Sequence, residues 1–76
     1  MLVMRLIDEV QARQLPRPAA RRAIRVRAGV SQVRMAEEMG VHRITLIRWE
    51  TGASEPRGES AERYAKLLDD LRQVAR

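Results

Sequence analysis

Three glycines divide the middle of this chain into short stretches with helical periodicity. Gly29, Gly40 and Gly52 each follow a stretch in which apolar residues recur every three or four positions. A glycine directly after such a stretch is typical of a helix C-terminus, because glycine adopts the left-handed backbone conformation at little cost. No alternation with a period of two residues appears. The sequence therefore predicts an all-α fold, a compact bundle of short helices.

Proline and serine residues mark the remaining helix boundaries. Pro16 and Pro18 end a first amphipathic segment, because proline disfavours helical geometry in the residue before it. Ser31 is a suitable N-cap for the helix that follows it. We expect helices over residues 2–15, 19–28, 32–39 and 43–51, and a final helix from residue 59 toward the C-terminus. Residues 1–15 then form an extra N-terminal helix for packing or dimerisation, and residues 16–76 form one domain with an extended C-terminal helix.

The length and composition exclude several classes of protein. A chain of 76 residues forms one small domain, which buries only about 60–65% of the surface of its unfolded state. The chain has no cysteine and a single histidine, so we expect no disulfide, metal site or thiol chemistry. No nucleophile motif, phosphate-binding loop or carboxylate pair stands out, so we expect no catalysis, cofactor or small-molecule ligand. No apolar run suffices for a membrane span or a signal peptide, and we expect a cytoplasmic protein.

Positive charge is concentrated in one part of the chain. The net charge is +5, and fourteen of the fifteen basic residues are arginine. Residues 17–48 hold eight arginines and two glutamates, whereas the other residues hold seven bases and eight acids. This concentration indicates a polyanionic partner, foremost nucleic acid. Trp49 and Tyr64 are the only aromatic residues, too few for stacking on a single strand, which favours duplex DNA. A solvated arginine-rich surface is the alternative that charge alone leaves open.

Residues 32–39 and 43–51 have the layout of a helix-turn-helix, two short helices joined by a tight turn with a glycine. Ala36 lies four residues before this glycine, where a small side chain lets the two helices cross closely. Leu46 and Trp49 are three residues apart and direct one apolar stripe of the second helix into the core. The opposite face of that helix carries Arg43, Ile44, Ile47 and Arg48.

The same region resembles a known family. The run from Ser31 to Val41, together with Arg48-Trp49-Glu50-Thr51-Gly52, is similar to the Cro/CI-type helix-turn-helix domains of the XRE family, which includes phage repressors. Arg25, Pro56 and Tyr64-Ala65 with Leu68 also match at family spacing. The resemblance covers about residues 19–68. It implies a lambda-repressor-like bundle in which the second helix of the motif, the recognition helix, lies in the major groove of DNA.

The resemblance and the residue chemistry imply a set of DNA contacts. The expected base contacts are Gln32, Arg43, Ile44, Ile47 and Arg48. Arginine pairs with guanine, and isoleucine packs on thymine methyl groups. The expected phosphate contacts are Arg21, Arg22, Arg34, His42, Thr45 and Arg57. We expect Arg21 and Arg22 to lie outside the core and to weaken binding to all sequences alike when removed. The resemblance also implies a structural pair of Arg25 with Glu50. A protein-binding patch is the alternative interpretation of Ile44 and Ile47.

Three features depart from the family pattern. His42 stands where the family usually has a serine-like N-cap, and Gly58 stands where it usually has an apolar residue. The N-terminal segment lies outside the pattern and leaves the oligomeric arrangement open. This segment has an apolar stripe formed by Val3, Leu6, Ile7 and Val10. The final helix has a second stripe formed by Leu67, Leu71 and Val74. We expect the two stripes to meet, either within one subunit or across the two-fold axis of a homodimer.

The sequence thus predicts a small sequence-specific DNA-binding protein. Its expected role is a transcriptional regulator or repressor of phage or mobile-element type, which occupies an operator in the nucleoid with its recognition helix in the major groove. Two alternatives stay open at this point. One is a DNA-binding accessory factor, such as a recombination directionality factor or an antitoxin. The other is a protein-interaction module that uses the terminal helices.

Overall fold

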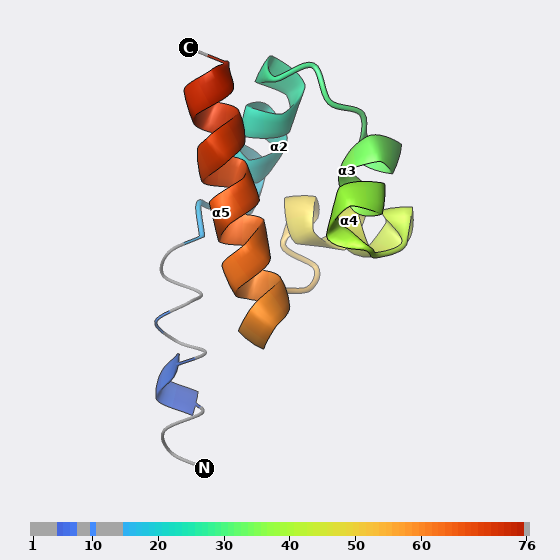
Figure 1. The fold of residues 1–76 in the computed structure, drawn as a ribbon. Coiled ribbons are helices and arrows are strands. Elements are labelled where there is room, and N and C mark those ends of the chain that lie inside the picture. Colours follow the sequence, from blue (N-terminus) through green and yellow to red (C-terminus); the bar gives the residue numbers. More distant parts are fainter. Residues whose placement is uncertain (1–4, 8–9, 11–14, 76) are drawn as a thin grey trace.

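The computed structural model describes residues 5–7, 10 and 15–75 (Figure 1). Its four full helices are α2 (Pro18–Arg27), α3 (Gln32–Met39), α4 (Arg43–Thr51) and α5 (Gly58–Val74). Residues 5–7 and 10 are also helical, and Leu15 lies in a bend. The rest of the helix expected over residues 2–15, including Val3, lies outside the described residues. No strand occurs in the described ranges, so the all-α prediction is confirmed.

Local sequence signals account for the helix boundaries. α2 begins at Pro18, one residue earlier than expected, because proline suits the first turn, where its missing N–H group needs no partner. The α3 N-terminus is capped by the Ser31 hydroxyl, which accepts a hydrogen bond of 3.0 Å from the Arg34 amide. α3 and α4 have the predicted bounds, and α5 begins one residue before the predicted position.

The turn between α3 and α4 depends on Gly40. This glycine has a φ of +69°, in the left-handed region that side chains disfavour. The Val41 amide then donates to the Ala36 carbonyl at 3.0 Å, which closes the end of α3. The Ala36 side chain is almost completely buried, as the close crossing of the two helices requires. The helix-turn-helix predicted from the spacing is therefore present.

The core lies between two pairs of helices. In Figure 1, α2 and α5 stand side by side, and α3 and α4 lie to one side of them. α4 packs against α2 and α3, while α5 packs against α2 and α3. The Trp49 and Tyr64 rings are tilted against each other with their centroids 5.0 Å apart, so α4 is joined to α5 through an aromatic pair. The buried apolar residues are Leu15, Ile24, Met35, Ala36, Met39, Leu46, Trp49, Ala61, Tyr64 and Leu68.

Within the described ranges, no helix has both the length and the apolar character needed to cross a membrane.

Candidate nucleic-acid interface

The outward face of α4 carries the side chains expected to contact bases. Arg43 and Arg48 are exposed, and 61% of the Ile44 surface is accessible. Ile47 is only partly exposed, so it offers a smaller apolar surface than expected. Leu46 and Trp49 on the opposite face are buried in the core. This face can therefore meet a ligand without any rearrangement of the packing beneath it.

Gln32 connects the beginning of α3 with the outward face of α4. Its carbonyl oxygen Oε1 accepts hydrogen bonds from Arg43 Nη2 at 3.2 Å and Nε at 3.4 Å. Its amide nitrogen Nε2 donates to Glu50 Oε1 at 3.3 Å. Gln32 thus joins an exposed arginine to a buried carboxylate. Arg43 is restrained on the protein surface before any DNA is bound.

Arg25 and Glu50 form a buried bidentate ion pair between α2 and α4. Arg25 Nε donates to Glu50 Oε2 at 2.6 Å, and Nη2 donates to Oε1 at 3.0 Å. The third contact of this guanidinium is the Val30 carbonyl at 2.8 Å. Glu50 lies in the last turn of α4, where the helix dipole disfavours a negative charge. The Arg25 guanidinium offsets this unfavourable interaction and the cost of burying the carboxylate. The pair ties the recognition helix to α2.

Arg21 is buried and is not a surface residue as expected. It lies in the core with 3% of its surface exposed, so the expectation that it lies outside the core is wrong. Its guanidinium donates to the Pro16 carbonyl at 2.8 Å, the Trp49 carbonyl at 2.9 Å and Glu55 Oε2 at 2.9 Å. The Trp49 carbonyl belongs to the end of α4, where the helix itself supplies no donor. Arg21 therefore caps the recognition helix from inside the protein.

The sequence carries a signal for the burial of Arg21. Arg21 lies four residues before Arg25 and three before Ile24, which places all three on the same side of α2. Glu55, the carboxylate that pairs with Arg21, was not among the expected site residues. Glu55 lies in the loop between α4 and α5, and a loop has no helical periodicity from which its partner could be inferred. Only the folded chain brings Glu55 to Arg21.

The other residues expected to contact phosphate differ in solvent exposure and in whether they form an ion pair. Arg22, His42 and Arg57 are exposed, and Thr45 is partly exposed. Arg34 is exposed but pairs with Glu38 one turn later, at 3.0 Å between Nη2 and Oε2. Such a surface pair contributes little stability, so a phosphate can replace Glu38 at small cost. Five of the six expected phosphate contacts are therefore accessible at the surface: Arg22, Arg34, His42, Thr45 and Arg57.

The beginning of α4 lacks a side-chain cap. His42 occupies the N-cap position, and its side chain makes no capping hydrogen bond. The departure from a serine-like cap therefore leaves the first amide groups of α4 without a side-chain acceptor. Amide groups at a helix N-terminus favour an anion, which agrees with a phosphate near His42.

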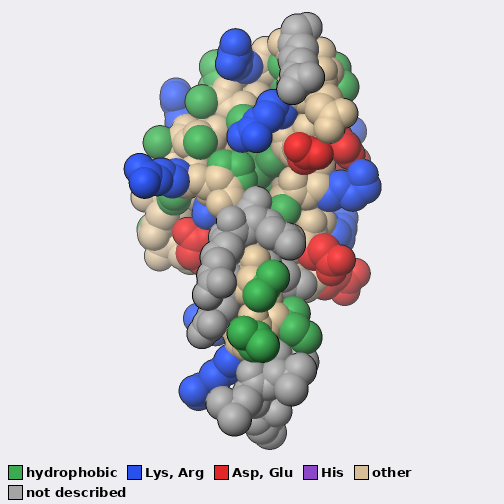
Figure 2. Space-filling model, turned by 90° about the vertical axis from the view of Figure 1, so that its left-hand side faces the viewer, with side chains coloured by type: hydrophobic (Ala, Val, Ile, Leu, Met, Phe, Trp, Pro, Cys, Tyr) green, Lys and Arg blue, Asp and Glu red, His purple; other side chains and the backbone are tan. Residues whose placement is uncertain are grey.

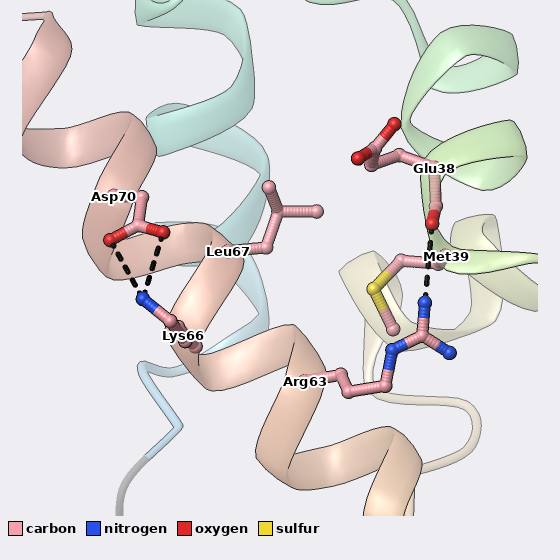
Figure 3. Close-up of a pocket in the computed structure, with 6 residues that line it drawn as sticks. All are labelled: Glu38, Met39, Arg63, Lys66, Leu67 and Asp70. Carbon is pink, nitrogen blue, oxygen red and sulfur yellow. Dashed lines mark hydrogen bonds and ion pairs between the residues drawn. The ribbon is translucent and has the colours of Figure 1, made fainter.

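The side of the molecule between α3 and α5 has a different electrostatic character. Figure 3 shows a groove there that is lined by two acidic side chains, Glu38 and Asp70, and two basic ones, Arg63 and Lys66. Arg63 donates to the Glu38 carbonyl at 3.4 Å, and Lys66 pairs with Asp70 at 3.2 Å. Because the two acids balance the two bases, this groove has little attraction for a polyanion. The arginine-rich surface of α4 is the better candidate for nucleic acid.

These features define the class of protein: a small helical bundle in which a helix-turn-helix presents an arginine-bearing helix to solvent. Residues 22–72 match the model of a helix-turn-helix family, and the chain belongs to this family, the Cro/CI-type helix-turn-helix of the XRE family. It is therefore a DNA-binding domain. No curated protein and no solved structure gives a significant match to the chain.

Proposed function

We propose that this protein is a sequence-specific regulator of transcription, a repressor of phage or mobile-element type that occupies operator DNA as a homodimer. α4 enters the major groove, and the mechanism is occupation of the site without a catalytic step. The observation that carries the proposal is the exposed face of α4, whose Arg43 is held by Gln32 and thereby by the buried Glu50.

Two arginines and two isoleucines determine the base preference in this proposal. Arg43 and Arg48 each present paired donors to the O6 and N7 atoms of guanine. Ile44, and to a smaller extent Ile47, packs on thymine methyl groups. The preferred half-site therefore contains guanine next to thymine. Gln32, already bonded to Arg43, keeps that guanidinium oriented and contributes its own polar contact.

Phosphate contacts supply affinity and orientation. Arg22, Arg34, His42, Thr45 and Arg57 contact the DNA backbone on either side of α4 in this proposal. Each neutralised phosphate releases counterions, so affinity falls steeply with salt concentration. Two-fold pairing of the domain matches half-sites about 34 Å apart, one turn of the duplex. The protein then acts where the DNA is, in the nucleoid.

Selection of preferred sites from a random duplex library tests the proposal. We expect a pair of inverted half-sites with guanine beside thymine, and loss of the preference at one position for Arg48→Ala. Arg22→Ala is the matched control, because it should weaken binding to all sequences alike and reduce the slope of log affinity against log salt by about one. Selection without any sequence preference would overturn the proposal. The same holds if Arg43→Ala and Arg48→Ala both left the preference intact.

A further inference from the structure

A single guanidinium group holds the α4–α5 loop, residues 52–57, against the rest of the protein. Arg21 Nη1 donates to the Trp49 carbonyl in the last turn of α4, and Nη2 donates to Glu55 Oε2 in the loop, each at 2.9 Å. Its Nε donates to the Pro16 carbonyl, just before α2, at 2.8 Å. Because the donors of a guanidinium lie in one rigid plane, the buried Arg21 fixes these three segments relative to one another.

Three further contacts restrain the same loop. The Ser54 amide donates to the Arg48 carbonyl of α4 at 3.3 Å. A Cβ atom on Gly52 would lie 3.3 Å from Pro18 Cγ, so the loop backbone passes close to the beginning of α2. Pro56 is buried, and its ring fixes the backbone at that position. The loop is therefore held in one conformation by its own chain.

Arg57 ends this loop and is the basic residue that the loop presents to solvent. It directly follows the buried Pro56, and its carbonyl accepts a hydrogen bond from the Ala61 amide at 3.4 Å. Its side chain is exposed and forms no ion pair with another described residue. The backbone of Arg57 is thus fixed on both sides, while its charge is available to a ligand.

The α4–α5 loop follows the helix that is expected to meet DNA. In Figure 1 it begins where α4 ends and leads to the N-terminus of α5. Figure 2 shows the side of the molecule away from α3 and α4, where Lys and Arg side chains are interspersed with Asp and Glu. Such a mixed surface has no concentrated positive potential. A duplex that binds α4 is therefore expected to meet the loop next.

We propose that Arg21 and Glu55 are positioning residues for DNA binding, which hold the α4–α5 loop so that Arg57 meets a backbone phosphate from a preorganised position. A group that is already ordered loses less conformational entropy when it binds. Arg21 then contributes to phosphate binding from the interior, through Glu55 and the loop, and touches no phosphate itself. The inference rests on the proposed function, because it deepens the phosphate contact assigned there to Arg57.

Two variants of Glu55 with the same charge separate positioning from electrostatics. The Glu55 side chain is 46% exposed, and removal of an acid ordinarily raises the affinity of a protein for DNA. Glu55→Ala and Glu55→Gln both remove this acid, but glutamine keeps an oxygen that can accept from Arg21. We expect Glu55→Ala to bind a duplex of mixed sequence about 5-fold more weakly than Glu55→Gln does. Fluorescence anisotropy over a range of salt concentrations measures both affinities.

The same pair of variants is then made together with Arg57→Ala. Arg57→Ala alone should reduce the slope of log affinity against log salt by about one. In this background Glu55→Ala and Glu55→Gln should bind equally, because the side chain that they position is gone. Glu59→Gln is the matched control: it also removes an acid two residues from Arg57, but one that is exposed and has no ion pair with another described residue. Its affinity should not fall.

The outcomes separate this inference from a structural role and from the proposed function. Equal binding by Glu55→Ala and Glu55→Gln would overturn the inference. A difference that persists in the Arg57→Ala background would also overturn it, since Glu55 would then act on the fold as a whole. Base preference should stay unchanged in Glu55→Ala, because phosphate contacts carry no sequence information. Each of these failures leaves recognition by α4 intact, whereas a wild-type chain that binds no duplex refutes the proposed function itself.

Discussion

Arginines in α2 and α4 have opposite roles in this molecule. Arg21 and Arg25 of α2 are buried, and their guanidinium groups bind carbonyl and carboxylate oxygens from distant parts of the chain. Arg43 and Arg48 of α4 are exposed and face solvent. The α2 arginines hold α4 in place, and the α4 arginines are available to DNA. A count of positive charge therefore does not measure a binding surface, since two of these arginines are neutralised inside the protein.

The largest expected effect comes from breaking the buried pair. Glu50→Ala leaves the Arg25 charge buried without its carboxylate, and we expect a loss of about 3–5 kcal/mol in the free energy of unfolding. Denaturant unfolding measures this loss. Replacing both partners with apolar residues, Arg25→Met with Glu50→Leu, should recover much of the stability because no unpaired charge remains. Equal loss in the single and the double variant would contradict this account.

Removal of Arg21 should destabilise the fold by about 1–3 kcal/mol, because it takes a charged donor from the Trp49 and Pro16 carbonyls. Arg22→Ala, one residue away but exposed, should leave the unfolding free energy within about 0.5 kcal/mol of the wild type. Thermal unfolding of both variants compares a buried with an exposed arginine directly. If both variants were equally stable, the structural role of Arg21 would be refuted.

Removal of Arg48 should have the reverse effect. We expect Arg48→Ala to cost about 1–3 kcal/mol in binding to the preferred site and to leave stability unchanged, because this side chain is exposed. Fluorescence anisotropy with specific and scrambled duplexes measures the binding loss. A variant with lower stability and unaltered base preference would place Arg48 among the structural arginines.

The smallest effect at neutral pH is expected from Tyr64→Phe. The Tyr64 hydroxyl is buried without a hydrogen-bond partner among the described residues, so its removal should change the unfolding free energy by less than about 1 kcal/mol. Burial, together with the nearby Glu50 carboxylate, raises the pKa of Tyr64 from 10.0 to about 12. The folded state therefore holds the phenol proton more tightly than the unfolded state.

This difference gives stability a pH dependence of known sign. The contribution is fully present below pH 10 and is lost as the pH rises from 10 to about 12, because the unfolded chain ionises first. Chemical denaturation between pH 9 and 11.5 should show the wild type losing stability more steeply than Tyr64→Phe. Parallel curves for the two proteins would exclude Tyr64 as the source.

Local sequence patterns were sufficient to predict helices α2 to α5 and the outward face of α4. The glycines, Ser31 and the prolines act on their immediate neighbours, so their effects on the backbone follow from the sequence. The alternation of Leu46 and Trp49 with Arg43 and Ile44 likewise assigns the two faces of one short helix. The family resemblance added the pairing of Arg25 with Glu50, which spacing alone does not show.

The tertiary structure decided which charges remain free. Arg21 pairs with Glu55, 34 residues later, and Gln32 joins Arg43 to Glu50 across two helices. A long charged side chain is buried only where loops or helix ends from other parts of the chain place oxygen atoms within reach of it. Otherwise it faces water. The sequence by itself determined the described helices and the outward face of α4, and only their packing determined which arginines support that face.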